Sequence, residues 1–174
     1  PPQVNIVFAV DDSGSVGSVQ DQMVDDIIRF VNQQPSNYNY GYEAYHDGGV
    51  WMGKGLGDYD SPEEFKNYVR NQIEPQIGGI VSSGYDSSTP SFAPSENQFS
   101  KFTSDNVQNY LVVLGDGDEY TSDGDWCQRS SSSHSSNSDY TLVSVFFGSN
   151  CVGEHQSLAD YGPDGNRLFY DTTK

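Results

Sequence analysis

The pattern of apolar and polar positions predicts three buried strands, at 4–10, 110–114 and 141–148. Each is a short apolar run rich in β-branched residues and without regular polar alternation, which is typical of strands buried on both faces of a parallel sheet. Two stretches with apolar residues at helical spacing, 18–34 and 61–76, predict amphipathic helices. Because strands alternate with helices, the pattern predicts an α/β fold, Rossmann-like, with a mostly parallel central sheet and helices on both faces.

The second of these helices has the clearest start signal. Ser61 stands at the cap position, Pro62 at the first helical position and Glu64 three residues after the cap, which is the arrangement of a capping box. Its expected buried stripe consists of Phe65, Val69 and Ile73.

The stretch 37–55 is rich in tyrosine and glycine and alternates in part, which predicts a hairpin of two strands that turns near Asp47 to Gly49. One strand of this hairpin would be the single antiparallel strand at the edge of the sheet. The other expected elements are a helix at 91–102, a short helix near 154–161 and a last strand at 167–170.

The chain of 174 residues has the size of a single domain, and we expect one domain over 1–174. Its 25 acidic residues against 8 Lys and Arg give a formal net charge of -17. Such a field repels phosphate backbones and anionic membranes, so we expect no nucleic-acid partner. Most of the carboxylates are expected on a solvated surface, and a cation site is expected only where they crowd together.

The sequence gives no sign of membrane insertion, since it has neither a charged and apolar leader nor an apolar stretch long enough to span a bilayer. It begins at PPQVN, so we expect a piece excised from a larger multidomain protein. Cys127 and Cys151 permit a single disulfide, which fits an extracellular compartment. Two free thiols fit the sequence equally well.

Three oxygen-bearing side chains, Asp11, Ser13 and Ser15, follow the first strand at alternate positions. A tight turn would direct one carboxylate and two hydroxyls to a common point, and hard divalent cations such as Mg²⁺ prefer oxygen ligands of this sort. The alternative is a turn followed by a helix cap, since Asp, Ser and Gly favour both. The triplet alone does not decide between them.

A second acidic cluster follows the strand at 110–114. Asp116 is the first carboxylate past this strand and is best placed to face the triplet, because ligands bind beyond the carboxyl ends of parallel strands at the switch point. Asp123 and Asp125, in SDGDW, would either form a second, calcium-type site or point into water. The histidines lack metal spacing and are expected to be ordinary surface residues: His46, His134 and His155.

With both clusters in place, the chain resembles von Willebrand factor A and integrin I domains. The triplet in DDSGS resembles their Asp-x-Ser-x-Ser signature, and GYDSSTPSF resembles the loop that supplies a threonine, here Thr89. LVVLGDGDE is similar to their Thr-Asp-Gly turn, with Asp116 in the matching position and Gly115 where the family has threonine. The resemblance continues in the same order through TLVSVFFG and LFYD, so it covers nearly the whole chain.

The resemblance implies a metal ion-dependent adhesion site formed by Asp11, Ser13, Ser15, Thr89 and Asp116. In the family, the cation keeps one coordination place for an acidic group, Glu or Asp, of a partner. The resemblance thus implies a non-enzymatic module for adhesion or ligand binding, with Mg²⁺ as the cation and Mn²⁺ or Ca²⁺ as alternatives. It also implies a monomeric module of an extracellular or cell-surface protein, most similar to a bacterial adhesin, whose partner is a protein or another ligand with a carboxylate.

Two departures from the family pattern bear on this function. Gly115 in place of threonine is expected to be harmless. The chain ends without a clear closing helix, which puts in doubt any affinity switch that depends on movement of that helix. The spare acid Asp12 is expected to point away from the metal.

Two other functions stay open. A haloacid dehalogenase-like phosphohydrolase also places an aspartate after the first strand, and GDGDEY superficially resembles one of its turns. That enzyme needs a second acid two residues after its nucleophile, where this chain has Ser13, and no lysine stands in the expected region. The third class keeps the fold and uses the metal only for stability.

Overall fold

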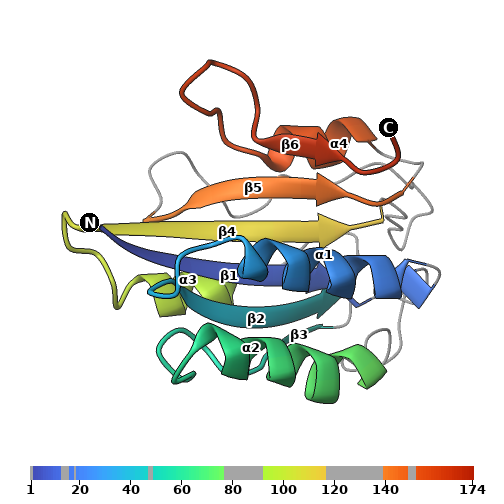
Figure 1. Ribbon diagram of the computed structural model, residues 1–174. Helices are drawn as coiled ribbons and strands as arrows, with labels where there is room; N and C mark the ends of the chain where they lie inside the picture. Colours follow the sequence, from blue (N-terminus) through green and yellow to red (C-terminus); the bar gives the residue numbers. More distant parts are fainter. Residues whose placement is uncertain are drawn as a thin grey trace.

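The computed structural model describes residues 2–12, 16–17, 19–46, 49–76, 92–116, 139–148 and 152–174, and of residues 46, 49–52, 76, 93 and 154 the backbone alone. Over these ranges six strands form one sheet in the order β3-β2-β1-β4-β5-β6 (Figure 1). In chain order they are β1 (Gln3–Asp11), β2 (Asn39–His46), β3 (Gly49–Met52), β4 (Val107–Gly115), β5 (Thr141–Phe146) and β6 (Phe169–Asp171).

Neighbouring strands from β2 to β6 run parallel, whereas β3 pairs antiparallel with β2 at one edge of the sheet. The predicted fold class, a mostly parallel sheet with one antiparallel edge strand from a hairpin, is therefore confirmed. Residues 47–48, between these two strands, lie outside the described residues.

A ladder of asparagine side chains at the amino ends of the strands fixes the register of the sheet centre. Asn5 on β1 donates from Nδ2 to Oδ1 of Asn109 on β4 at 2.9 Å, and Asn39 on β2 donates to Oδ1 of Asn5 at 3.2 Å. The same residues are backbone partners across the strands. Because a slip by one residue would turn every side chain to the opposite face, the ladder keeps the carboxyl ends of β2, β1 and β4 level.

Alternation along β1 divides the core into two layers, one on each face of the sheet. The apolar residues at even positions, such as Ile6 and Phe8, pack in the layer under α1 and α2. Val7 and Ala9 pack in the layer that also contains Phe99 of α3 and Leu158 of α4. Figure 1 views the sheet from the side of α1 and α2. The bounds are α1 (Gln20–Asn32), α2 (Pro62–Tyr68), α3 (Ala93–Phe99) and α4 (Val152–Leu158).

Helix α2 begins where the capping signals predict. The Ser61 hydroxyl accepts a hydrogen bond from the backbone N–H of Glu64 at 3.2 Å, and the Glu64 carboxylate accepts from the N–H of Asp60 at 2.9 Å. The helix continues as a π-helical turn, η2 (Val69–Ile73), and ends as a 3-10 turn, η3 (Glu74–Gln76). The predicted stripe is buried, with exposed fractions of at most 1%: Phe65, Val69 and Ile73.

The remaining predicted elements agree with the structure in type and order, and differ in their bounds. The helix expected at 91–102 starts at Ala93, because Pro94 is tolerated only in the first turn of a helix. The strand expected at 141–148 ends at Phe146. Among the described residues, no helix has the length and apolar character that a membrane crossing requires.

Candidate cation site at the carboxyl ends of β1 and β4

The fold brings three aspartates, Asp11, Asp12 and Asp116, to the end of the sheet where the parallel strands have their carboxyl ends; we call this end the acidic edge. Asp11 ends β1, Asp12 follows it directly, and Asp116 follows β4. The two strands pair in parallel register up to Val10 and Leu114, so Asp11 lies beside the end of β4. The arrowheads of the parallel strands mark this edge in Figure 1. The chain continues from β1 to β2 on one side and from β4 to β5 on the other, so this edge is the switch point at which ligands bind in open α/β sheets.

The three carboxylates are buried, with exposed fractions of 0% for Asp11, 2% for Asp12 and 6% for Asp116. Burial of a charged carboxylate is costly unless an opposite charge or hydrogen-bond donors offset it. A divalent cation between the ends of β1 and β4 would offset this charge, and carboxylate oxygens suit Mg²⁺. The residues that the structure describes therefore fit a cation, and their role as ligands stays a prediction.

Asp12 lies on the other side of the strand end from Asp11. Its backbone N–H donates to the carbonyl of Tyr45 at 2.8 Å, which extends the pairing of β1 with β2 by one residue. Burial first, and the nearby carboxylate of Asp12 second, raise the pKa of Tyr42, whose side chain packs in the layer of α1 and α2. The expectation that Asp12 points away from a bound cation stays a prediction.

Most of the other predicted site residues lie outside the described residues: Ser13, Ser15, Thr89, Asp123, Asp125, Cys127 and Cys151. The five-residue cation site, the second calcium-type site and the disulfide therefore stay predictions. Within the described ranges, no group of 3 or more His, Cys, Asp and Glu side chains is gathered closely enough to hold a metal ion. A cation bound by Asp11 and Asp116 would thus depend on hydroxyl ligands such as those of the triplet.

The backbone of Asp116 is held against the end of β5. The N–H of Phe147 donates to the carbonyl of Gly115 at 2.8 Å, which carries the pairing of β4 and β5 up to the acidic edge. A β-carbon added at Gly148 would overlap the carbonyl group of Asp116. Position 148 therefore requires glycine so that the chain after β5 can pass close to Asp116.

His155 corrects the expectation that the histidines are ordinary surface residues. Its side chain on α4 is fully buried, with an exposed fraction of 0%, and its ring lies 5.3 Å from the ring of Phe146 between centroids. It lies directly against Gly115, at the acidic edge. Metal-ligand spacing was the wrong criterion for this residue, because its neighbours come from strands that are distant in sequence.

A further buried acid, Glu43 on β2, anchors the start of α3. Its Oε1 accepts hydrogen bonds from the Ser95 hydroxyl at 2.8 Å and from the Ser95 N–H at 3.3 Å. Burial raises the pKa of Glu43 to about 8; the bonds from Ser95 oppose this rise, and the carboxylate of Glu96 adds to it. Residues 77–91, which include Thr89, come just before α3 in the chain. Glu43 therefore holds the helix that follows this segment.

We expect Glu43 to make the fold less stable as the pH rises from about 5 to about 8. In the folded chain the carboxyl keeps its proton up to a pKa of about 8, whereas in the unfolded chain it loses the proton near its ordinary value of 4.5. The folded state binds more protons in this window, so the free energy of unfolding falls with rising pH. Urea unfolding should show that the free energy of unfolding falls by about 3 kcal/mol more for the natural chain than for Glu43→Gln, which does not titrate, between about pH 5 and pH 8. Equal pH slopes for the two proteins would refute this role.

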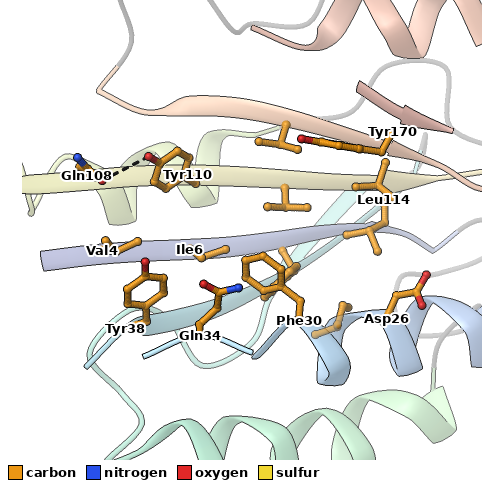
Figure 2. Close-up of a pocket in the computed structure, with 15 residues that line it drawn as sticks. Val4, Ile6, Asp26, Phe30, Gln34, Tyr38, Gln108, Tyr110, Leu114 and Tyr170 are labelled. Carbon is orange, nitrogen blue, oxygen red and sulfur yellow. Dashed lines mark hydrogen bonds between the residues drawn. The ribbon is translucent and has the colours of Figure 1, made fainter. Parts of the chain in front are cut away.

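An apolar hollow formed by described residues lies away from these aspartates. Figure 2 shows this groove, with a volume of about 530 Å³, on the face of the sheet that carries α1. Phe30 of α1 and Gln34, just past that helix, line one side, and Tyr170 of β6 lines the other; the Tyr110 hydroxyl donates to Oε1 of Gln108 at 3.4 Å. The three aspartates are not part of its lining, so the groove and the acidic edge are separate features.

No protein-family model and no curated protein sequence matches the chain. Solved structures resemble its fold at low sequence identity. The pilus adhesin SpaC from Lactobacillus rhamnosus GG matches with a TM-score of 0.64 and 13% identity, over 99% of this chain and 28% of that one. Proximal thread matrix protein 1 from the mussel byssus matches with a TM-score of 0.62 and 12% identity, over 98% of this chain and 41% of that one.

A von Willebrand factor type A structure from Catenulispora acidiphila matches with a TM-score of 0.55 and 15% identity, over 91% of this chain and 36% of that one. The chain thus spans less than half the length of each of these three proteins. Since the identities are low, the likeness concerns the fold alone. The chain has a von Willebrand A-like α/β fold.

Proposed function

We propose that the chain is a cation-dependent module for adhesion or ligand binding. Asp11 and Asp116 would bind a divalent cation together with the hydroxyls of Ser13, Ser15 and Thr89. Mg²⁺ suits this set best, with Mn²⁺ and Ca²⁺ as alternatives, because all the ligands are oxygen atoms. An acidic group of the partner, Glu or Asp, would complete the coordination. The module would act as a monomer within a larger chain and without catalysis.

One observation carries this proposal: Asp11 and Asp116 are both buried at the carboxyl ends of two neighbouring parallel strands, at the switch point of the sheet. Neutral hydroxyls in the rest of the ligand set would leave the bound cation a net positive charge despite two carboxylates. It could then attract an external carboxylate, although the chain as a whole has a net charge of -17. The fold likeness to a pilus adhesin supports an adhesion module in an extracellular or cell-surface setting.

The first test is the effect of Mg²⁺ on stability and its removal by EDTA. A ligand that binds only the folded state at a hundred times its Kd adds about 2.7 kcal/mol to the free energy of unfolding. We expect saturating Mg²⁺ to add an amount of this order, EDTA to abolish it, and Asp11→Asn to be insensitive to both. Asp25→Asn, which removes the same charge from the exposed face of α1, is the matched control and should respond like the natural chain.

The second test concerns the open coordination place. A surface that carries a peptide with one glutamate should retain the chain in Mg²⁺ and release it in EDTA, whereas the glutamine version of the peptide should not retain it. Retention that persists in EDTA, or in Asp11→Asn, would rule out the adhesion function. Mg²⁺ stabilisation without any retention would favour the alternative in which the metal is structural. Turnover of p-nitrophenyl phosphate that depends on Mg²⁺ and on Asp11 would favour the phosphohydrolase.

A further inference from the structure

The space beside Gly115 is filled by side chains from two other elements. A β-carbon at this position would lie 2.7 Å from Cε1 of His155 and 3.4 Å from the hydroxyl of Tyr45. The first distance is shorter than the contacts that β-carbons make in real proteins. A side chain at position 115 would therefore overlap the imidazole of His155, which occupies this space. His155 also packs against Phe146, the backbone partner of Gly115 on β5, so its ring is held in position from two sides.

These two side chains meet over the end of β1, where Asp11 lies. Asp11 is the backbone partner of Tyr45 on β2, and β1 lies between β2 and β4 in the sheet. The Tyr45 hydroxyl nevertheless reaches position 115 on β4, so its side chain crosses the end of β1. Alternation from Val7 and Ala9, which share a core layer with Tyr45, places Asp11 on this same face. Asp11 therefore lies at the end of β1 on the face of the sheet where Tyr45 and His155 meet.

We infer that Tyr45 and His155 are positioning residues that orient the Asp11 carboxylate for the cation, an inference that rests on the proposed function. A phenol hydroxyl and an imidazole N–H are both hydrogen-bond donors that suit a carboxylate. Donors of this kind behind a metal ligand fix its orientation, and their loss typically weakens metal binding 10-fold to 100-fold. Gly115 is part of the arrangement, because any side chain at this position would displace the imidazole. The glycine that replaces the family's threonine is then a requirement of this site.

The test measures Mg²⁺ affinity by calorimetry and, separately, stability in EDTA by urea unfolding. Tyr45→Phe and His155→Leu should each weaken Mg²⁺ binding about tenfold or more, whereas His155→Gln, which keeps an N–H donor, should retain most of the affinity. Tyr45→Phe removes a single oxygen atom and should fold normally. Tyr40→Phe is the matched control, because it removes a buried hydroxyl from the opposite face of β2 and should leave Mg²⁺ affinity unchanged.

A cycle at Gly115 separates positioning from packing. Gly115→Thr should lower both stability in EDTA and Mg²⁺ affinity, because the threonine displaces His155. Adding His155→Ala to Gly115→Thr should restore stability, since the space is free again, without restoring the affinity. If the natural chain binds Mg²⁺ and the Tyr45→Phe and His155→Leu variants bind it with the same affinity, the inference is overturned and the proposed function is left intact. Failure of the natural chain to bind Mg²⁺ would overturn both.

Discussion

Replacing Phe65 with alanine is expected to lower the free energy of unfolding by about 4 kcal/mol. The Phe65 ring is fully buried and is the centre of an aromatic cluster under α2. It stacks on Tyr40 with centroids 5.1 Å apart and on Phe8 at 6.0 Å, and Tyr59 meets it edge to face at 5.1 Å. Truncation removes contacts on several sides at once and leaves a cavity that the remaining rings, which come from two strands and a loop, fill poorly.

Urea unfolding in EDTA is the measurement for this variant, so that no cation contributes to stability. Phe169→Ala is the matched control, because the Phe169 ring on the edge strand β6 is only half-buried and lies 6.2 Å from the ring of Phe146. We expect this control to lose less than half as much stability as Phe65→Ala. Equal losses for the two variants would mean that the cluster under α2 is not a main source of stability.

The fold was predictable from the sequence because its elements rest on local signals. Apolar runs without alternation indicated the central strands, and Ser61, Pro62 and Glu64 indicated the start of α2, which the structure confirms with the cap at Ser61. The position of Asp11 and Asp116 at one edge was also predictable, because parallel strands point their carboxyl ends to the same side. These predictions need only the order of the elements and the direction of each strand.

The surroundings of the site were not predictable by the same means. Gly115 was expected to be a harmless replacement and His155 a surface residue, because nothing near either of them in sequence indicates a partner. Their contact arises only when α4 packs on the sheet beside β4. Glu43 was missed for a similar reason: a single acid in a strand pattern reads as an exposed position until Ser95 from α3 is seen to bind it. Buried polar groups are specified by long-range packing, which hydropathy patterns do not encode.

Replacing Gly148 with alanine is expected to lower the free energy of unfolding by about 3 kcal/mol and to weaken Mg²⁺ binding at the same time. The added β-carbon would overlap the carbonyl group of Asp116, and both partners in this contact are backbone. No change of side-chain rotamer relieves such an overlap, so either the chain after β5 or the end of β4 must move. Because Asp116 is the first residue past β4, a shift of its backbone would also displace its carboxylate from the proposed cation site.

Gly153→Ala is the matched control for this variant. A β-carbon at Gly153, on the exposed side of α4, would meet no atom within 4 Å. Alanine also favours a helix over glycine by about 1 kcal/mol, so this control should be neutral or slightly stabilising. Urea unfolding in EDTA and Mg²⁺ calorimetry on both variants separate the two effects. If Gly148→Ala matched Gly153→Ala in both measurements, the close approach at Asp116 would not constrain the acidic edge. If Gly148→Ala lost stability but bound Mg²⁺ as tightly as the natural chain, Asp116 would contribute to the fold rather than to the cation site.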